Sequence, residues 1–164
     1  MAMNDFKIIS VYFDKEFNLI GVPSTIIKKW NIVTDIDRIL CLKSPYCDEE
    51  LESFIKKVFD LCFSQSVKEP PKESALQKFR GVKSYTASIK GLGLVGITWL
   101  KNKGYTLAPT WRSTKHKNAF LHMDNKSMQV SYDYCDNELA EMFRRSLDLS
   151  IIEPMSEAPA PDIS

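Results

Sequence analysis

The sequence predicts an α+β fold in which antiparallel sheet carries two main amphipathic helices. Runs of β-branched and aromatic residues alternate with short polar turns, as in hairpins. Two segments instead place apolar residues at the helical period of 3.6. The length of 164 residues fits one domain, which we expect over residues 1–150. Prolines among Glu, Ser and Ala predict a disordered, acidic tail over residues 151–164.

The first predicted element is a β-hairpin. Residues 6–13 are rich in Ile, Val, Phe and Tyr, residues 14–18 form a polar turn, and residues 19–22 resume an apolar run. Pro23 lacks the N–H that strand pairing uses, so we expect the second strand to end there. Residues 36–42 predict a further strand that leads into a helix.

The first predicted helix is the clearest element of the sequence. Asp48 is its expected N-cap, because its carboxylate can accept hydrogen bonds from the free amides of the first turn. Glu49 and Glu50 suit the positive end of the helix dipole. A short second helix is expected over residues 72–80, closed by Gly81. The apolar stripe of the first helix consists of Leu51, Phe54, Ile55, Val58, Phe59 and Cys62.

The second half of the chain again predicts strands followed by a helix. Residues 94–100 and 105–110 flank a Lys-Asn-Lys-Gly turn, and residues 120–123 and 127–132 flank another turn, so we expect two hairpins. A helix follows over residues 137–149. Its expected cap is Asp136, and its expected buried face consists of Leu139, Met142, Phe143 and Leu147.

The two predicted helices belong to similar segments. Residues 46–61 align without gaps on residues 134–149, and seven of the sixteen positions are identical. Both segments follow a predicted strand, which indicates two strand–cap–helix units in pseudo-repeats of about residues 1–80 and 81–150. Shared descent or similar demands on the two helices would each explain the likeness. Two copies are too few for a solenoid and favour a pseudo-symmetric α+β domain.

Charge is distributed unevenly along a chain whose net charge is only +1. Residues 1–73 carry a net charge of −2, residues 74–123 carry +9 without a single acid, and residues 124–164 carry −6. No apolar run is long enough to span a bilayer, and the start lacks the features of a secretion signal. We therefore expect a cytoplasmic protein without a membrane partner.

No ordered set of reactive residues predicts an enzyme. Gly91, Gly93 and Gly96 have the spacing of a dinucleotide-binding motif, but strand-like residues follow them, and the first acid after them is Asp124, too far along the chain to bind the ribose. The four cysteines and two histidines lack metal-ligand spacing, so we expect neither a metal nor a cofactor. A Cys/His pair involving Cys135 stays an alternative, because such partners meet only in the fold.

Basic and aromatic residues alternate over residues 101–117, close to Trp99, Tyr105 and Trp111. Such a combination serves single-stranded nucleic-acid grooves and also protein recognition. Because residues 110–118 are polar, we expect a loop there with Trp111 exposed. The candidate binding residues are Lys101, Lys103, Trp111, Arg112, Lys115, His116 and Lys117.

The C-terminal third resembles immunity proteins of bacterial contact-dependent growth inhibition systems. The residues that carry the resemblance are 105–110, 128–132 and 136–147, the last beginning Asp-Asn-Glu-Leu. The resemblance implies a cytosolic protein that binds a cognate toxin domain one to one, often a nuclease, and blocks its active site or substrate surface. Inhibitors of nucleases are usually acidic, unlike the basic residues 74–123. Either the acidic residues Asp133, Asp136, Glu138 and Glu141 face the toxin, or the basic residues face an acidic region of the toxin outside its active site. The alternative is an RNA- or single-stranded-DNA-binding module that uses residues 74–123.

Overall fold

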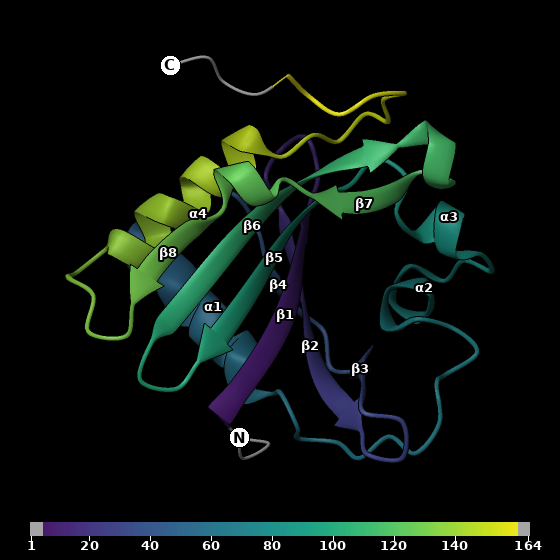
Figure 1. The fold of residues 1–164 in the computed structure, drawn as a ribbon, viewed down its shortest axis with the longest axis horizontal. Coiled ribbons are helices and arrows are strands. Elements are labelled where there is room, and N and C mark those ends of the chain that lie inside the picture. The colour runs from purple at the N-terminus through teal and green to yellow at the C-terminus, as the bar shows by residue number, and fades with distance from the viewer. Residues whose placement is uncertain (1–4, 161–164) are drawn as a thin grey trace.

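The computed structural model describes residues 5–160 and has the α+β fold that the sequence predicts. An eight-stranded antiparallel sheet has the order β3-β2-β1-β5-β6-β7, with β4 also paired to β2 and β8 to β6 (Figure 1). The strands are β1 (Phe6–Phe13), β2 (Leu19–Ile27), β3 (Ile32–Asp35), β4 (Leu40–Leu42), β5 (Gly93–Leu100), β6 (Gly104–Ser113), β7 (Ala119–His122) and β8 (Met128–Ser131). The helices are α1 (Asp48–Asp60), α2 (Ala75–Arg80), α3 (Tyr85–Ser88) and α4 (Glu138–Leu149).

The two halves of the sheet have the same connections. Each half has two long antiparallel strands, then two short strands that both pair with the second long strand, then a helix. The halves meet where β1 pairs with β5 and Ile9 lies opposite Ile97. These residues are 88 positions apart, which is also the offset between residues 46–61 and 134–149. The sheet therefore has approximate twofold symmetry about the β1–β5 pair.

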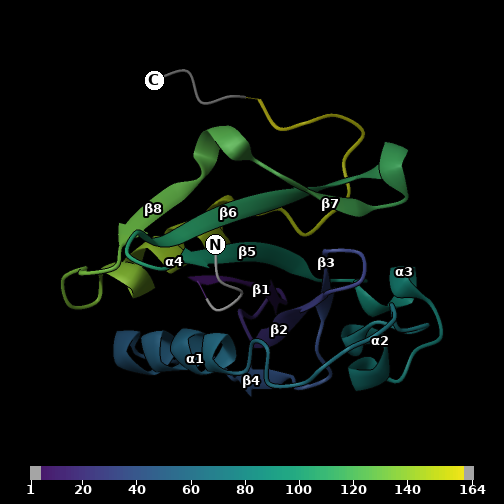
Figure 2. The same ribbon diagram turned by 60° about the horizontal axis from the view of Figure 1, so that its bottom comes forward.

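The main core lies between the sheet and the helices α1 and α4. Successive side chains of a strand point to opposite faces, so Ile9, Val11 and Phe13 of β1 join this core while Tyr12 joins a smaller cluster on the other face. The smaller cluster includes Ala75 and Leu76 of α2 and residues that flank α3. Figure 2 shows α2 and α3 side by side, at a distance from α1. Both faces of the sheet are thus partly covered.

The contacts between α1 and α4 repeat the symmetry. The Arg144 guanidinium lies 5.2 Å from the centre of the Tyr46 ring, and the Lys56 ammonium lies 5.2 Å from the centre of the Tyr134 ring. Position 56 aligns with position 144 and position 46 with position 134. Each half therefore places a cation over the aromatic ring of the other half, which requires the two helices to run antiparallel.

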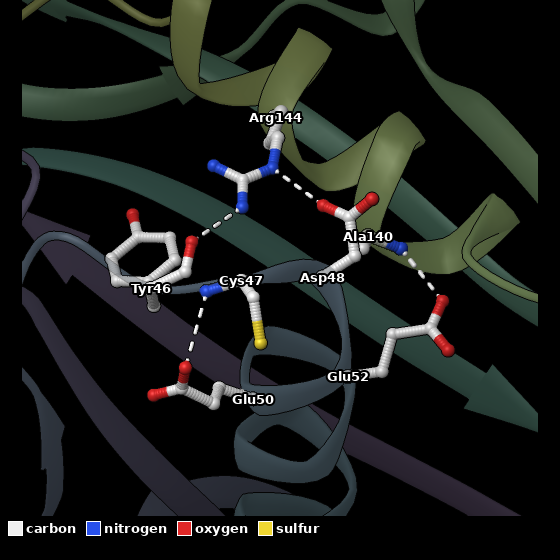
Figure 3. A network of polar contacts seen from close by, with 7 residues as sticks. All are labelled: Tyr46, Cys47, Asp48, Glu50, Glu52, Ala140 and Arg144. Carbon is white, nitrogen blue, oxygen red and sulfur yellow. Dashed lines mark hydrogen bonds and ion pairs between the residues drawn. The ribbon is translucent and has the colours of Figure 1, made fainter.

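The helix N-termini differ from prediction in one detail. The N-caps are Cys47 and Asn137, where the sequence predicts Asp48 and Asp136. The carboxylates of Glu50 and Glu138 instead reach back, at 3.4 Å and 3.3 Å, to accept from the amides of Cys47 and Cys135. Figure 3 shows the Cys47–Glu50 contact and, nearby, the Glu52 carboxylate accepting from the Ala140 amide at 2.9 Å. Because Ala140 lies in the first turn of α4, α1 helps to cap its partner helix.

Four further expectations are corrected. The second expected hairpin does not form, because β7 and β8 both pair with β6 and not with each other. Pro23 does not end β2. It lies between the residues of β2 that pair with β3 and those that pair with β4, so neither strand needs an N–H from it. Its carbonyl accepts a hydrogen bond from the Ile36 amide. Residues 32–42 form two short strands where one was expected over 36–42. Residues 151–155, predicted to be disordered, bond to the β6 backbone, while residues 161–164 lie outside the described part of the chain.

Candidate partner-binding surface

Trp111 and Arg112 are buried, which corrects the prediction of an exposed loop. Their exposed fractions are 9% and 3%, because β6 continues to Ser113. The Arg112 guanidinium stacks 5.1 Å from the Phe120 ring centre and donates to the carbonyls of Asn118 and Ile152. Burial lowers the pKa of Arg112. Arg112 thereby stabilises the β6–β7 turn, and the burial of both side chains leaves little of them for a partner to contact.

The remaining basic candidates separate into two groups. Lys115 and His116 lie in a single 3-10 turn (Thr114–His116) after β6, and Lys117 follows it. Lys101 and Lys103 lie in the turn that precedes β6. The ten residues of β6 separate the groups by about 30 Å. All five side chains are exposed, but the structure does not gather them into one groove.

The acidic candidates lie near Lys101 and Lys103, at the start of β6. Asp133 and Asp136 are exposed in the loop between β8 and α4, and the Tyr132 amide of this loop donates to the Lys103 carbonyl at 3.2 Å. Glu138 is occupied with the Cys135 amide. Glu141 is exposed on α4. Acidic and basic candidates therefore alternate at this corner, without a uniform charge that would attract one class of partner.

The cysteines and histidines do not form a reactive cluster in the described residues. All four cysteines are free, and burial raises the pKa of the Cys62 thiol. His116 is bonded through Nδ1 to the Ser113 hydroxyl at 2.9 Å. Across residues 5–160 no group of three or more His, Cys, Asp or Glu side chains could hold a metal ion. Gly93 and Gly96 lie within β5, as the strand interpretation of the glycine motif predicts.

An exposed apolar surface at the β2–β3 hairpin was missed by the sequence analysis. Trp30, Ile32 and Val33 are exposed by 42%, 48% and 42%, and they lie at or next to the edge strand β3. The Lys29 ammonium lies 4.8 Å from the Trp30 ring centre. Ile32 and Val33 are consecutive in β3, so they point to opposite faces of the sheet. Large exposed apolar side chains on an edge strand are nevertheless unusual on a protein without a partner. We define these three residues as the hairpin surface.

A groove of about 490 Å³ lies beside the hairpin surface, between the end of β2 and the chain that leaves α1. Its apolar lining includes Ile27, Phe63 and Val67. Its basic lining consists of Lys28, Lys29 and Lys68, and no acidic residue occurs among the described residues that line it. The Lys-Lys-Trp-Asn-Ile-Val sequence of residues 28–33 was the available signal, since it joins cations to apolar residues at a turn.

Comparisons with known proteins identify the fold alone. No protein-family model matches the sequence, and no curated protein matches it. A protein of unknown function from Neisseria meningitidis has a similar structure, with a TM-score of 0.64, 14% sequence identity, and coverage of 92% of this chain and 99% of the other. At that identity the likeness supports the α+β architecture. Among the described residues, no helix has both the length and the apolar character to cross a membrane.

Proposed function

We propose that this chain is a cytoplasmic immunity protein that binds a cognate toxin domain one to one and blocks its active site or substrate surface. The observation that carries the binding function is the hairpin surface, because Trp30, Ile32 and Val33 are each exposed at the edge of the sheet, next to the end of β2 that lines the groove. The resemblance of residues 105–110, 128–132 and 136–147 to immunity proteins supplies the class of partner.

Trp30 is the expected centre of the interaction. A Trp side chain can bury on the order of 200 Å², and Trp residues are prominent among the side chains that dominate interface energies. The adjacent Lys28, Lys29 and Lys68 add a basic rim, which would speed association with an acidic partner. The nucleic-acid alternative has less support, because Trp111 is buried and the lysines that flank β6 lie at its two ends.

Co-expression with the toxin domain encoded beside this gene tests the proposal. We expect a one-to-one complex on purification and loss of toxin activity in it. Trp30→Ala should weaken the complex about 30-fold, which corresponds to about 2 kcal/mol. Phe17→Ala is the matched control, because Phe17 is 40% exposed but precedes β2, at the opposite end of that strand from Trp30. Absence of a complex and of protection would contradict the proposal.

A further inference from the structure

The C-terminal segment adds a short parallel pairing to β6. The Ile151 amide donates to the Thr110 carbonyl at 2.9 Å, and the Met155 amide donates to the Arg112 carbonyl at 2.8 Å. The Met155 carbonyl accepts from the Thr114 amide at 2.9 Å, so Met155 forms a parallel bridge opposite Ser113. Residues 151–155 therefore use backbone groups that the end of β6 leaves available after its pairing with β5 ends at Pro109.

The first half begins the same arrangement and does not complete it. The Phe63 amide donates to the Ser24 carbonyl at 3.1 Å, as the Ile151 amide does to Thr110 in the second half. The donors Phe63 and Ile151 are again 88 positions apart, and the acceptors Ser24 and Thr110 are 86 positions apart. Beyond Phe63, however, the chain departs from β2, and residues 65–68 become the far wall of the groove. The groove thus occupies the place that residues 151–155 fill in the other half.

The backbone of β2 faces this groove at defined positions. The carbonyls of Pro23 and Ile27 accept hydrogen bonds from the amides of Ile36 and Trp30, on the side of β2 where β3 lies. The carbonyl of Ser24 points to the opposite side, where it accepts from Phe63 beside the groove. Main-chain groups alternate along a strand, so the carbonyl of Ile26 and the amide of Lys28 face the same way as Ser24. They correspond to the carbonyl of Arg112 and the amide of Thr114, which bond to Met155 in the second half.

Charge indicates the kind of segment that fits. In the second half, Glu153 belongs to the segment that lies along β6, and its carboxylate lies 3.5 Å from the Lys15 ammonium. Lys115 and Lys117 occupy the turn beyond this segment. In the first half, Lys28 and Lys29 occupy the equivalent turn, and Lys68 lines the opposite wall. A bound segment with acidic residues would therefore contact lysines on both sides of the groove.

We infer that the groove binds an extended, acidic segment of the partner protein as a strand parallel to β2. The segment donates one amide to the Ile26 carbonyl and accepts one hydrogen bond from the Lys28 amide, while an apolar side chain contacts Ile27, Phe63 and Val67. This inference rests on the proposed function, because it names how the partner is held.

Lys28→Pro tests the strand pairing directly. Lys28 is the second residue of the turn in which Ile27 accepts from the Trp30 amide, a position that proline suits, and the preceding Ile27 is extended. The substitution removes both the charge and the amide hydrogen. Lys28→Ala is the matched control, because it removes the charge and keeps the amide. We expect the toxin domain to bind Lys28→Pro about tenfold more weakly than Lys28→Ala.

Hydrogen exchange of the wild-type complex gives an independent measurement that needs no variant. The Lys28 amide should exchange at least tenfold more slowly in the complex than in the free protein. If a complex forms but both variants bind alike and Lys28 is not protected, the groove inference is overturned and the proposed function stands. If no complex forms, both are overturned. Concentration-dependent dimerisation that Lys28→Pro abolishes would assign the groove to a second copy and also overturn the inference.

Discussion

Replacing Arg144 by Ala should weaken the contact between the two main helices and destabilise the fold. Arg144 donates from Nε to the Asp48 carboxylate at 2.9 Å and from its terminal nitrogen to the Tyr46 carbonyl at 2.8 Å (Figure 3). Its guanidinium also covers the Tyr46 ring. The ion pair is partly exposed and contributes about 0.5 kcal/mol, the carbonyl hydrogen bond about 1 kcal/mol, and the ring contact about 0.5–1 kcal/mol. We expect a loss of about 2 kcal/mol in the free energy of unfolding.

The symmetry-related Lys56 supplies the control for this measurement. Lys56 covers the Tyr134 ring as Arg144 covers Tyr46, but no ion pair to Asp136 corresponds to the one at Asp48 among the described contacts. Lys56→Ala should therefore cost about 1 kcal/mol less than Arg144→Ala. Urea unfolding followed by tryptophan fluorescence measures both. Equal losses in the two variants, or a loss below about 0.5 kcal/mol for Arg144→Ala, would refute the assignment of these contacts.

Three further outcomes are expected. Gly104→Ala should destabilise the fold by about 3 kcal/mol or more in urea unfolding, because the residue has a φ of 114° and an added Cβ would overlap the backbone of β8 and Tyr132. Gly91→Ala is the control: its φ is 76° and the space around it is open, so it should cost about 1 kcal/mol. Burial raises the pKa of Asp35 in the folded state above its value in the unfolded state. The folded protein therefore loses stability as pH rises from the unfolded pKa through the folded pKa, because the buried carboxyl group must ionise. Asp35→Asn should be more stable than the wild type at pH 7 and not at pH 3. Arg112→Met should free the chain at Ile152, and limited proteolysis should cut residues 151–160 about tenfold faster. Equal cutting rates would show that Arg112 does not retain the segment.

Local patterns predicted most of the fold. The apolar stripe of α1, the Gly81 end of α2 and the β5–β6 hairpin all depend on residues close in sequence, and each is found where expected. The predictions were wrong where contacts with distant segments of the chain determine the local structure. Pro23 tolerates its place in β2 only because no strand needs its amide there. Residues 151–155 are ordered by bonds to β6, which lies about 40 positions earlier.

The binding residues were harder to predict for the same reason. Trp111 and Arg112 stand in a polar sequence, but Phe120 and Ile152 cover Arg112 from segments that the local pattern does not contain. Conversely, Trp30 stands in a sequence that resembles an ordinary hairpin, and its exposure follows from the position of β3 at the edge of the sheet. Edge positions depend on the order of strands, which periodicity alone does not give.

The difference between the two halves follows from the continuity of the chain. Within the described residues no named strand follows α4, so residues 151–155 are available to lie along β6. After α1 the chain must reach α2, α3 and then β5, so it can bond to β2 at Phe63 but cannot continue beside it. A symmetric sheet in a single chain therefore leaves one end of a long strand closed by its own polypeptide and the equivalent end open. That open end is where the exposed Trp30 and the three lysines lie, and the backbone geometry required of a guest is the one that Met155 already adopts on the other side.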